Sequence, residues 1–260
     1  MFSTQMATSS LVANGQAPAN SVRPLELFPG VHRGELPSIS QRVLSTGSAA
    51  VDSALPDSGL PKGAVTELAV YGGAALGTSL SLGVCRTAME AAIAQGGEVP
   101  WCAFVDPGKT LYAPGVESRG VDLARLLVVR PPSEALERTS IRLVESHAFA
   151  VVVVDTLGTV GASASGLQGS WNRAIRRLSL AAEASGSVVV LLTDGELQRS
   201  LPLPVALRLE LSRPEMGRLL LKVGKDRKGR VSGPHRVPWG ASLGNPLSGH
   251  PGPVRLAHVS

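Results

Sequence analysis

The sequence predicts an α/β fold with a central, mostly parallel sheet, helices on both faces of that sheet, and antiparallel strands near the C-terminus. Short apolar runs alternate along the chain with segments of helical period. Strands that are apolar at nearly every position are typical of parallel sheets covered on both faces by helices. Each run ends in glycine, proline or aspartate, which favour turns. This pattern favours a doubly wound sheet over a two-sheet sandwich.

The first predicted strand and helix flank a glycine-rich turn. Residues 64–71 (AVTELAVY) have the composition of a strand, and a helix begins near Ser79 and ends at Gly96-Gly97. Two adjacent rows of apolar residues on this helix predict its buried face: Leu80, Val84, Ala88 and Ala92, with Cys85, Met89 and Ile93 beside them.

The later elements repeat the alternation. Further strands are predicted at residues 101–105, 126–129, 151–154 and 188–193, helices at 133–146 and 171–183, and a Gly/Ser/Ala loop at 158–170. Residues 208–211 and 219–223 read as strands that turn antiparallel, with a basic turn at 225–229. The predicted organisation is a flexible arm at 1–40 with one docking segment, a core at 41–212, a basic strand or hairpin extension at 213–240, and a flexible tail at 241–260.

Composition excludes several classes of protein. The 260 residues are 43% hydrophobic, enough for a large core. The two cysteines, Cys85 and Cys102, are too few for a disulfide framework, and their spacing is not that of a metal site. We therefore expect both to be core thiols in a reducing cytosol. Neither a secretion signal nor an apolar run of the ~20 residues needed to cross a bilayer is apparent. A cytoplasmic protein is therefore expected.

The positive charge of the chain is local. Residues 208–236 hold nine Lys/Arg against three Asp/Glu, an excess larger than the net charge of +5 of the whole chain. Clustered charge of one sign indicates a polyanion or an acidic protein surface as partner. The predicted contact residues are Lys222, Lys225, Arg227, Lys228 and Arg230.

The stretch YGGAALGTSL at residues 71–80 departs from a phosphate-binding P-loop at one position. Gly72, Gly77 and Ser79 match the pattern G-x-x-x-x-G-K-[ST], but Thr78 replaces the lysine. In a working P-loop the lysine neutralises phosphate oxygens, and the hydroxyl serves Mg²⁺ together with a strand-end aspartate, here Asp155. Loss of that charge weakens catalysis by roughly a few kcal/mol, so ATP hydrolysis is not expected.

Neighbouring segments carry a family resemblance. STGSAAVDSALPDSGLPKGAVTEL at 45–68, WCAFVDPG at 101–108 and VVVVDTLG at 151–158 resemble bacterial RecA recombinases, which implies a RecA-like P-loop core. The resemblance also implies further departures. Gly108 stands where a recombinase has an acidic residue that activates water, and Thr193-Asp194 replaces the Asn-Gln pair that senses the γ-phosphate.

A narrower resemblance covers about residues 28–230. FPGVHRG at 28–34, LYAPGVESRGVDLARLLVVRP at 111–131 and RRLSLAAEASG at 176–186 resemble ImuA, the RecA-like accessory family of DNA-damage-induced mutagenesis. This resemblance implies a non-catalytic scaffold of the SOS response and translesion synthesis, associated with the nucleoid. The implied partners are RecA, an ImuB-type inactive Y-family polymerase homologue and, indirectly, an error-prone replicative-type polymerase.

The predicted site is a degenerate nucleotide site without catalytic residues or a required cofactor. It comprises Gly72, Gly77, Thr78, Ser79 and Asp155, of which Ser79 and Asp155 would hold Mg²⁺ if ATP binds. One alternative is a nucleotide-switched ATPase that borrows Lys62 or Lys109. Another is a DNA-binding module, such as a recombinase paralogue, which uses the basic segment to bind DNA phosphates.

Overall fold

The computed structural model describes residues 42–72, 75–157, 164–196, 203–215 and 217–239. The predictions for the arm at 1–40 and the tail at 241–260 lie outside these residues. None of the described helices is long and apolar enough to span a membrane.

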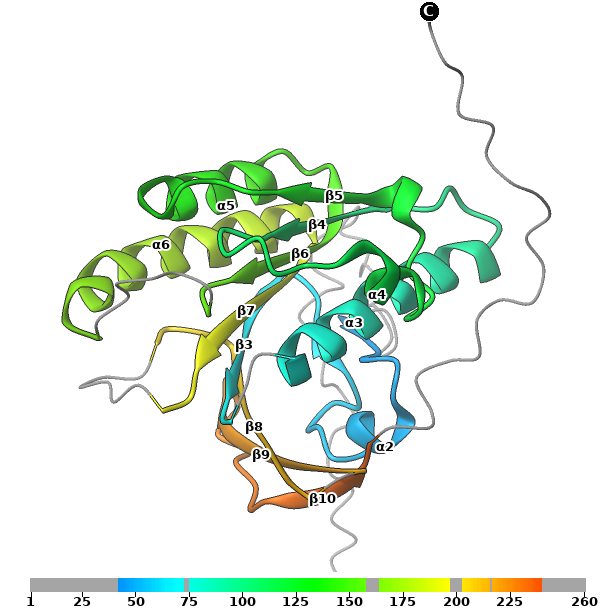
Figure 1. Ribbon diagram of the computed structural model, residues 1–260, viewed down its shortest axis with the longest axis vertical. Coiled ribbons are helices and arrows are strands. Elements are labelled where there is room, and N and C mark those ends of the chain that lie inside the picture. Colours follow the sequence, from blue (N-terminus) through cyan, green and yellow to red (C-terminus); the bar gives the residue numbers. More distant parts are fainter. Residues whose placement is uncertain (1–41, 73–74, 158–163, 197–202, 216, 240–260) are drawn as a thin grey trace, which may run out of the picture. The chain divides into compact units, whose positions relative to one another are not determined.

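An eight-stranded sheet forms the centre of the protein, in the order β10-β9-β8-β3-β7-β6-β4-β5 (Figure 1). Its strands are β3 (Ala64–Val70), β4 (Trp101–Val105), β5 (Leu126–Val129), β6 (Phe149–Asp155), β7 (Val188–Asp194), β8 (Leu207–Glu215), β9 (Arg218–Asp226) and β10 (His235–Pro238). Strands β1 (Val43–Leu44) and β2 (Leu60–Pro61) form a separate antiparallel ribbon.

The sheet is parallel from β8 to β5 and antiparallel at its C-terminal end. Strand β3 pairs in parallel with β7 on one side and β8 on the other, whereas β9 runs antiparallel to β8 and β10 antiparallel to β9. The predicted mostly parallel sheet is therefore confirmed. The strand predicted at 208–211 is parallel to β3, and only its later neighbours are antiparallel. Strand β8 extends past residue 212, so the predicted basic extension continues the core sheet.

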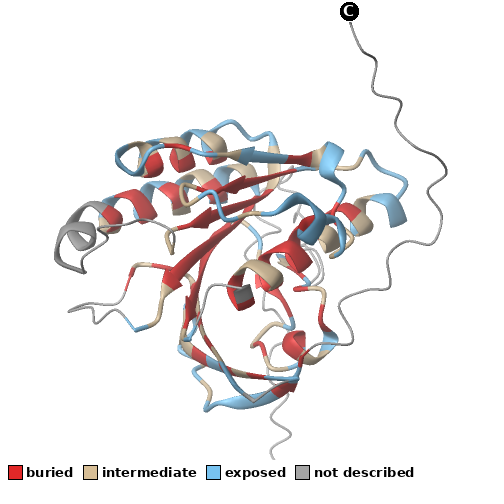
Figure 2. Cartoon of the chain, viewed as in Figure 1, coloured by how far each residue is buried: buried red, intermediate tan, exposed pale blue. Residues whose placement is uncertain are grey.

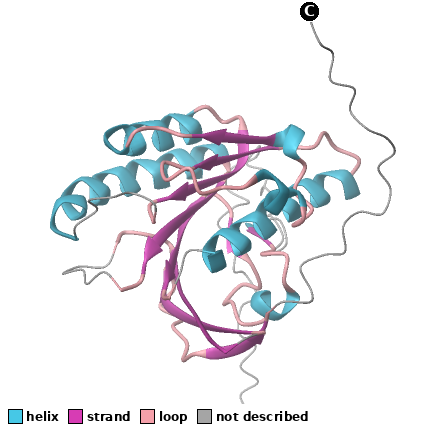
Figure 3. Ribbon diagram, in the orientation of Figure 1, coloured by secondary structure: helices cyan, strands magenta, loops and turns pink. Residues whose placement is uncertain are grey.

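Helices cover both faces of the sheet (Figures 1 and 3). They are α2 (Ala49–Asp52), α3 (Ala75–Ala94), α4 (Ala113–Glu117), α5 (Leu136–Glu145) and α6 (Ala164–Ser185), with 3-10 turns η2 (Leu123–Arg125) and η3 (Ser133–Ala135). Helices α5 and α6 pack on one face, and α3 lies on the other.

The sheet separates two apolar cores. The core on the α3 face contains Leu68, Leu80 and Phe104, and that on the α5 and α6 face contains Ile175 and Leu178, all fully buried. Figure 2 shows the buried residues concentrated along the central strands. Because β3 and β7 are covered on both sides, most of their residues are apolar, as the sequence pattern predicted.

Two helices begin earlier than predicted. Helix α3 begins at Ala75 rather than near Ser79, and α6 begins at Ala164 inside the predicted loop at 158–170. Alanine and leucine in these segments favour helix strongly enough to offset the glycines among them. The predicted end of α3 is confirmed, since Gly96 has φ +68° and the Gly97 N–H bonds the Ala92 carbonyl.

One member of the predicted buried face of α3 is exposed. Ile93 is 58% exposed, whereas Leu80, Val84, Cys85, Ala88 and Met89 are buried as predicted. Helix α3, at about 30 Å, is longer than a seven-residue strand of about 23 Å, so its last turn extends beyond the sheet that buries the rest. The two cysteines are free and buried, as expected.

A buried carboxylate joins the three strands at the centre of the sheet. Glu67 on β3 is fully buried; its Oε1 accepts a hydrogen bond of 2.7 Å from the Thr193 hydroxyl on β7. Its two oxygens also lie 3.1 and 3.0 Å from one guanidinium nitrogen of Arg208 on β8. A second acid, Glu210, links Arg208 to Lys222 on β9. This polar chain crosses four strands.

Arg208→Met is expected to lower the free energy of unfolding by about 3 kcal/mol, because it leaves the Glu67 carboxylate buried without its arginine. Lys222→Met, which removes an ion pair whose lysine side chain is 47% exposed, is the matched control and should cost less than about 1 kcal/mol. Urea unfolding followed by circular dichroism measures both. Equal decreases in the free energy of unfolding would show that the buried Glu67–Arg208 pair contributes no more to stability than the exposed pair.

Candidate functional site

The residues of the predicted nucleotide site gather at one edge of the sheet, where the parallel strands end. Strand β3 ends before the glycine turn, and β6 ends at Asp155. Strand β7 lies between them, so at the usual strand spacing Asp155 is about 10 Å across the sheet from the end of β3. This carboxyl edge is where ligands of parallel α/β sheets bind.

The two glycines of the motif have structural reasons to be glycine. Gly72 has φ +76°, a conformation that other residues adopt only with strain. Gly77 faces the sheet so closely that a Cβ there would lie 2.8 Å from Val70 Cγ2 and 3.2 Å from Leu192 Cδ2. The turn geometry and the packing of α3 therefore require both glycines, whether or not phosphate binds.

Thr78 and Ser79 lie in the first turns of α3 and are half-buried. The first turn of a helix has backbone N–H groups without partners inside the helix, and these groups favour anions. Neither side chain is cationic, so this end of α3 offers hydrogen bonds without the positive charge of a P-loop lysine. Ser79 is the hydroxyl that would serve Mg²⁺.

Asp155 is a buried carboxylate at the end of β6. It is 2% exposed, and its Oδ1 accepts a hydrogen bond of 2.8 Å from the Leu157 N–H. Burial raises the pKa of the Asp155 carboxyl; the Leu157 N–H opposes this, and the negative charge of Asp106 adds to it. A divalent cation beside Ser79 and Asp155 would offset this burial, so the oxygen donors present fit Mg²⁺ in type.

Asp106 closes a turn at the end of β4. Its Oδ1 accepts a hydrogen bond from the Thr110 N–H at 2.9 Å, its Oδ2 accepts one from the Leu111 N–H at 3.1 Å, and Arg130 Nε lies 3.5 Å away. Gly108 lies inside this turn, so the turn presents no acidic side chain at the position that activates water in a recombinase.

The pair at the end of β7 is bonded within the protein. The Thr193 hydroxyl bonds Glu67, and the Asp194 carboxylate accepts a hydrogen bond of 2.8 Å from the Glu196 N–H. Both residues therefore stabilise the strand and the turn that follows it.

Neither lysine suggested as a substitute lies beside Thr78 in one copy of the chain. Lys62 precedes β3, so the length of the strand, about 23 Å, separates it from the glycine turn. Lys109 is exposed, with φ +55°, in the turn after β4, and β4 is the third strand from β3. Three strand spacings amount to about 14 Å, more than a lysine side chain spans.

Most of the predicted partner-binding cations are bonded within the protein. Lys222 pairs with Glu210, and the Lys225 ammonium donates to the Leu203 carbonyl. Lys228 and Arg230 pair with Asp57, and Arg230 also pairs with Asp226. Arg227 is exposed in the turn after β9. Their role in partner binding stays a prediction.

The Arg230 contacts change the titration of its neighbours. Hydrogen bonds from Arg230 lower the pKa of both the Asp57 and Asp226 carboxyls, and these two carboxylates raise the pKa of Arg230. Arg230 therefore remains charged and fixes the turn after β9 against the segment before β2.

Sequence reasoning named Arg227 as a contact residue but missed the charged region that it forms with other cations at the opposite edge of the sheet. Arg42 and Lys62 lie there together with Arg227. Each of these cations was visible in the sequence, but no periodic pattern joins residues 42 and 62. No group of three His, Cys, Asp or Glu side chains suitable for a metal ion occurs among the described residues.

Comparison with known proteins identifies the relatives of this chain. Residues 31–192 match the family model described as RecA N-terminal domain. The chain is 36% identical to Protein RecA of Symbiobacterium thermophilum over 174 residues, which is 62% of this chain and 47% of that protein. It is 36% identical to Protein RecA of Rhizobium rhizogenes over 58% of this chain and 43% of that protein. It is 34% identical to Protein RecA of Deinococcus radiodurans over 59% of this chain and 43% of that protein. The matched region spans less than half the length of each relative.

Asp155→Asn is expected to stabilise the protein at neutral pH. Because the folded-state pKa of this carboxyl is raised, its ionised form opposes folding, and that cost disappears as the pH falls through the folded pKa. Asparagine carries no charge and can still accept the Leu157 N–H. The stability difference between variant and wild type, from chemical unfolding at several pH values, should shrink as the solution becomes acidic. A difference that is constant with pH would contradict the stated origin of the pKa shift.

Proposed function

The chain belongs to the RecA N-terminal domain family, and from this premise we propose that it is a non-hydrolysing RecA-like accessory protein that acts through protein contacts in DNA-damage-induced mutagenesis. The observation that carries the proposal is the neutral helix terminus at Thr78, beside glycines that the packing itself requires. The fold of a nucleotide-binding domain is present without the cation that phosphoryl transfer uses.

Residues at three positions on the carboxyl edge support the proposed absence of hydrolysis. Thr78 supplies no charge to the phosphates, the turn containing Gly108 offers no acid to activate water, and Thr193 is bonded to Glu67. Each change removes a group that would act on the transition state. Their combination supports a protein that does not turn over ATP.

The accessory role is supported by the resemblance of several ordered segments to ImuA. In this proposal the chain contacts RecA and an ImuB-type inactive polymerase homologue, and through them serves an error-prone replicative-type polymerase in translesion synthesis. Such a protein works in the cytoplasm beside the nucleoid. In the same proposal, the cations on β9 and in the turn after it bind DNA phosphates as a secondary target.

A second candidate function, a nucleotide-dependent switch, is favoured by Ser79 and Asp155. Burial raises the pKa of the Asp155 carboxyl, and a divalent cation beside it would favour the ionised form. When bound, Mg-ATP would supply that cation. Ser79 would hold the metal, and the first N–H groups of α3 would orient the phosphates.

Calorimetric titration with Mg-ATP distinguishes the two candidates. The accessory function predicts no binding heat for the wild type, whereas Thr78→Lys should restore binding, because it returns a charge whose absence costs roughly a few kcal/mol. Hydrolysis should stay absent in Thr78→Lys, since Gly108 is unchanged. Wild-type binding that Asp155→Ala abolishes would favour the switch.

Co-elution in size-exclusion chromatography tests the accessory role directly. The full chain is mixed with purified RecA or with the purified ImuB-type homologue from the same organism, without nucleotide. Co-elution with at least one of them is expected, and Asp155→Asn should not alter it. Failure to co-elute with either protein would refute the accessory function.

A further inference from the structure

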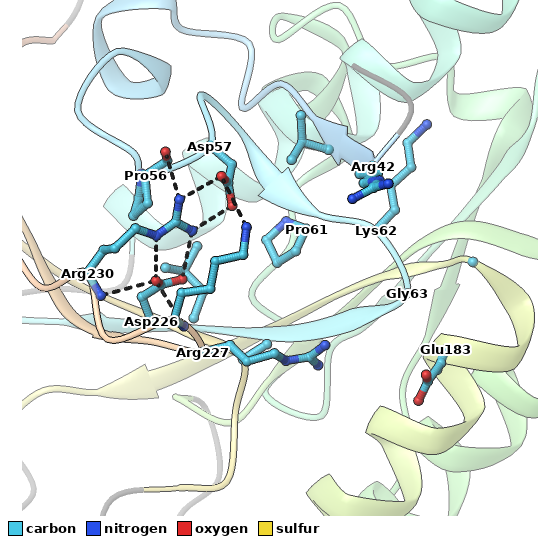
Figure 4. A pocket seen from close by; sticks show the side chains of 15 residues that line it. Arg42, Pro56, Asp57, Pro61, Lys62, Gly63, Glu183, Asp226, Arg227 and Arg230 are labelled. Carbon is cyan, nitrogen blue, oxygen red and sulfur yellow. Dashed lines mark hydrogen bonds and ion pairs between the residues drawn. The ribbon is translucent and has the colours of Figure 1, made fainter. Parts of the chain in front are cut away.

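A pocket of about 690 Å³ opens at the amino edge of the sheet, opposite the P-loop (Figure 4). Its walls come from the β1–β2 ribbon, from the segments that precede β3 and β8, from the end of α6 and from the turn after β9. The volume lies within the range of ~300–1,000 Å³ that is usual for ligand sites. The pocket is separate from the nucleotide site described above.

Three cations in this pocket have no counter-charge. Arg42, Lys62 and Arg227 line it, and among the described residues none of their side chains makes a hydrogen bond or ion pair. Arg42 and Lys62 face each other, because the Lys62 N–H bonds the Arg42 carbonyl at 2.8 Å and continues the ladder of β1 and β2. Like charges opposite each other on paired strands are unfavourable, so an anion between them would relieve the repulsion.

The other cations of the wall are neutralised within the protein. Arg230 bonds both Asp57 and Asp226 at 2.7 and 2.8 Å, and Lys228 lies 3.8 Å from Asp57. Figure 4 shows Arg42 and Lys62 together on one side of the pocket, with the bonded Arg230 on the other. The attraction for an anion therefore comes from Arg42, Lys62 and Arg227, and Glu183 is the one lining carboxylate outside the Arg230 cluster.

Apolar groups lie among these charges. Val43, Pro61 and Leu207 line the same pocket. A run of phosphodiesters would leave these groups without a contact and would meet the lining carboxylates with like charge. A polypeptide fits both the charged and the apolar groups of the pocket. Its carboxylates can pair with the cations, and its apolar side chains can cover Val43 and Pro61. Its N–H groups can donate hydrogen bonds to the lining carboxylates.

We propose that this pocket binds an acidic segment of another protein. Carboxylates of the segment pair with Arg42, Lys62 and Arg227, and an apolar side chain between them packs against the half-buried Val43 and Pro61. The inference rests on the proposed function only in taking protein contacts as the activity of the chain.

The terminal segments of the chain itself do not fit the pocket chemically. Residues 1–41 contain only Glu26 and Glu35 as acidic residues, and residues 240–260 contain none. The three cations of the pocket, by comparison, would be matched best by several carboxylates close together in sequence. The occupant is therefore a partner in which acidic residues are clustered.

Fluorescence anisotropy tests the pocket with a labelled peptide in which glutamates alternate with leucines, titrated with the full chain. Binding is expected at low salt and should weaken as salt screens the charges. The double variant Arg42→Ala, Lys62→Ala should bind about tenfold more weakly. Arg42→Lys with Lys62→Arg should restore binding, and Arg138→Ala, at an exposed site on α5, should leave it unchanged.

Several outcomes would overturn the proposal. Equal binding of a peptide in which glutamine replaces every glutamate would contradict it. Binding of the double variant as tightly as the wild type would contradict it as well. Tighter binding of a labelled single-stranded oligonucleotide through Arg42 and Lys62 would make the pocket a nucleic-acid site instead. If the double variant still co-elutes with RecA or the polymerase homologue, and the peptide fails to bind, the accessory function stands and the pocket assignment falls.

Discussion

The ion pair between Glu67 and Arg208 is the interaction on which the centre of the sheet depends. A carboxylate inside a sheet covered on both faces is stable only with a partner, and here the partners come from both neighbouring strands. Because Thr193 and Arg208 both reach Glu67, β7 and β8 are fixed in register on the two sides of β3. Glu210 and Lys222 extend this polar chain to β9, so the basic strand β9 is held to the core.

This arrangement gives the two edges of the sheet different electrostatic character. The carboxyl edge holds the buried acids Asp106 and Asp155, and Thr78 supplies no positive charge beside them. The amino edge holds Arg42, Lys62 and Arg227 without counter-charges among the described residues. In a working nucleotide-binding domain the attraction for an anion is strongest at the carboxyl edge. Here Arg42, Lys62 and Arg227 supply positive charge at the opposite edge, which supports protein contacts as the proposed activity.

The sequence predicted those parts of the structure that depend on periodicity and local turns. Continuous apolar runs located the parallel strands, and the glycine turn located the carboxyl-edge site. Helices α3 and α6 begin earlier than the pattern predicts, because alanine and leucine in their first turns favour helix more than the neighbouring glycines oppose it. The Glu67–Thr193 bond joins residues 126 positions apart, and Arg42 meets Lys62 across a ribbon of two-residue strands, so neither leaves a local signal.

The glycine motif illustrates why a sequence signature and an activity can separate. Gly72 is needed for a positive φ. Gly77 is needed because a Cβ at this position of α3 would lie 2.8 Å from Val70 Cγ2. Both needs belong to the fold, so they persist when nothing binds. Phosphate transfer depends instead on charge, which packing does not require and a single substitution removes. Thr78 is therefore the residue on which the proposed loss of phosphate transfer rests. Burial of the Asp155 carboxylate adds a cost to folding that the hydrogen bond from the Leu157 N–H does not fully offset.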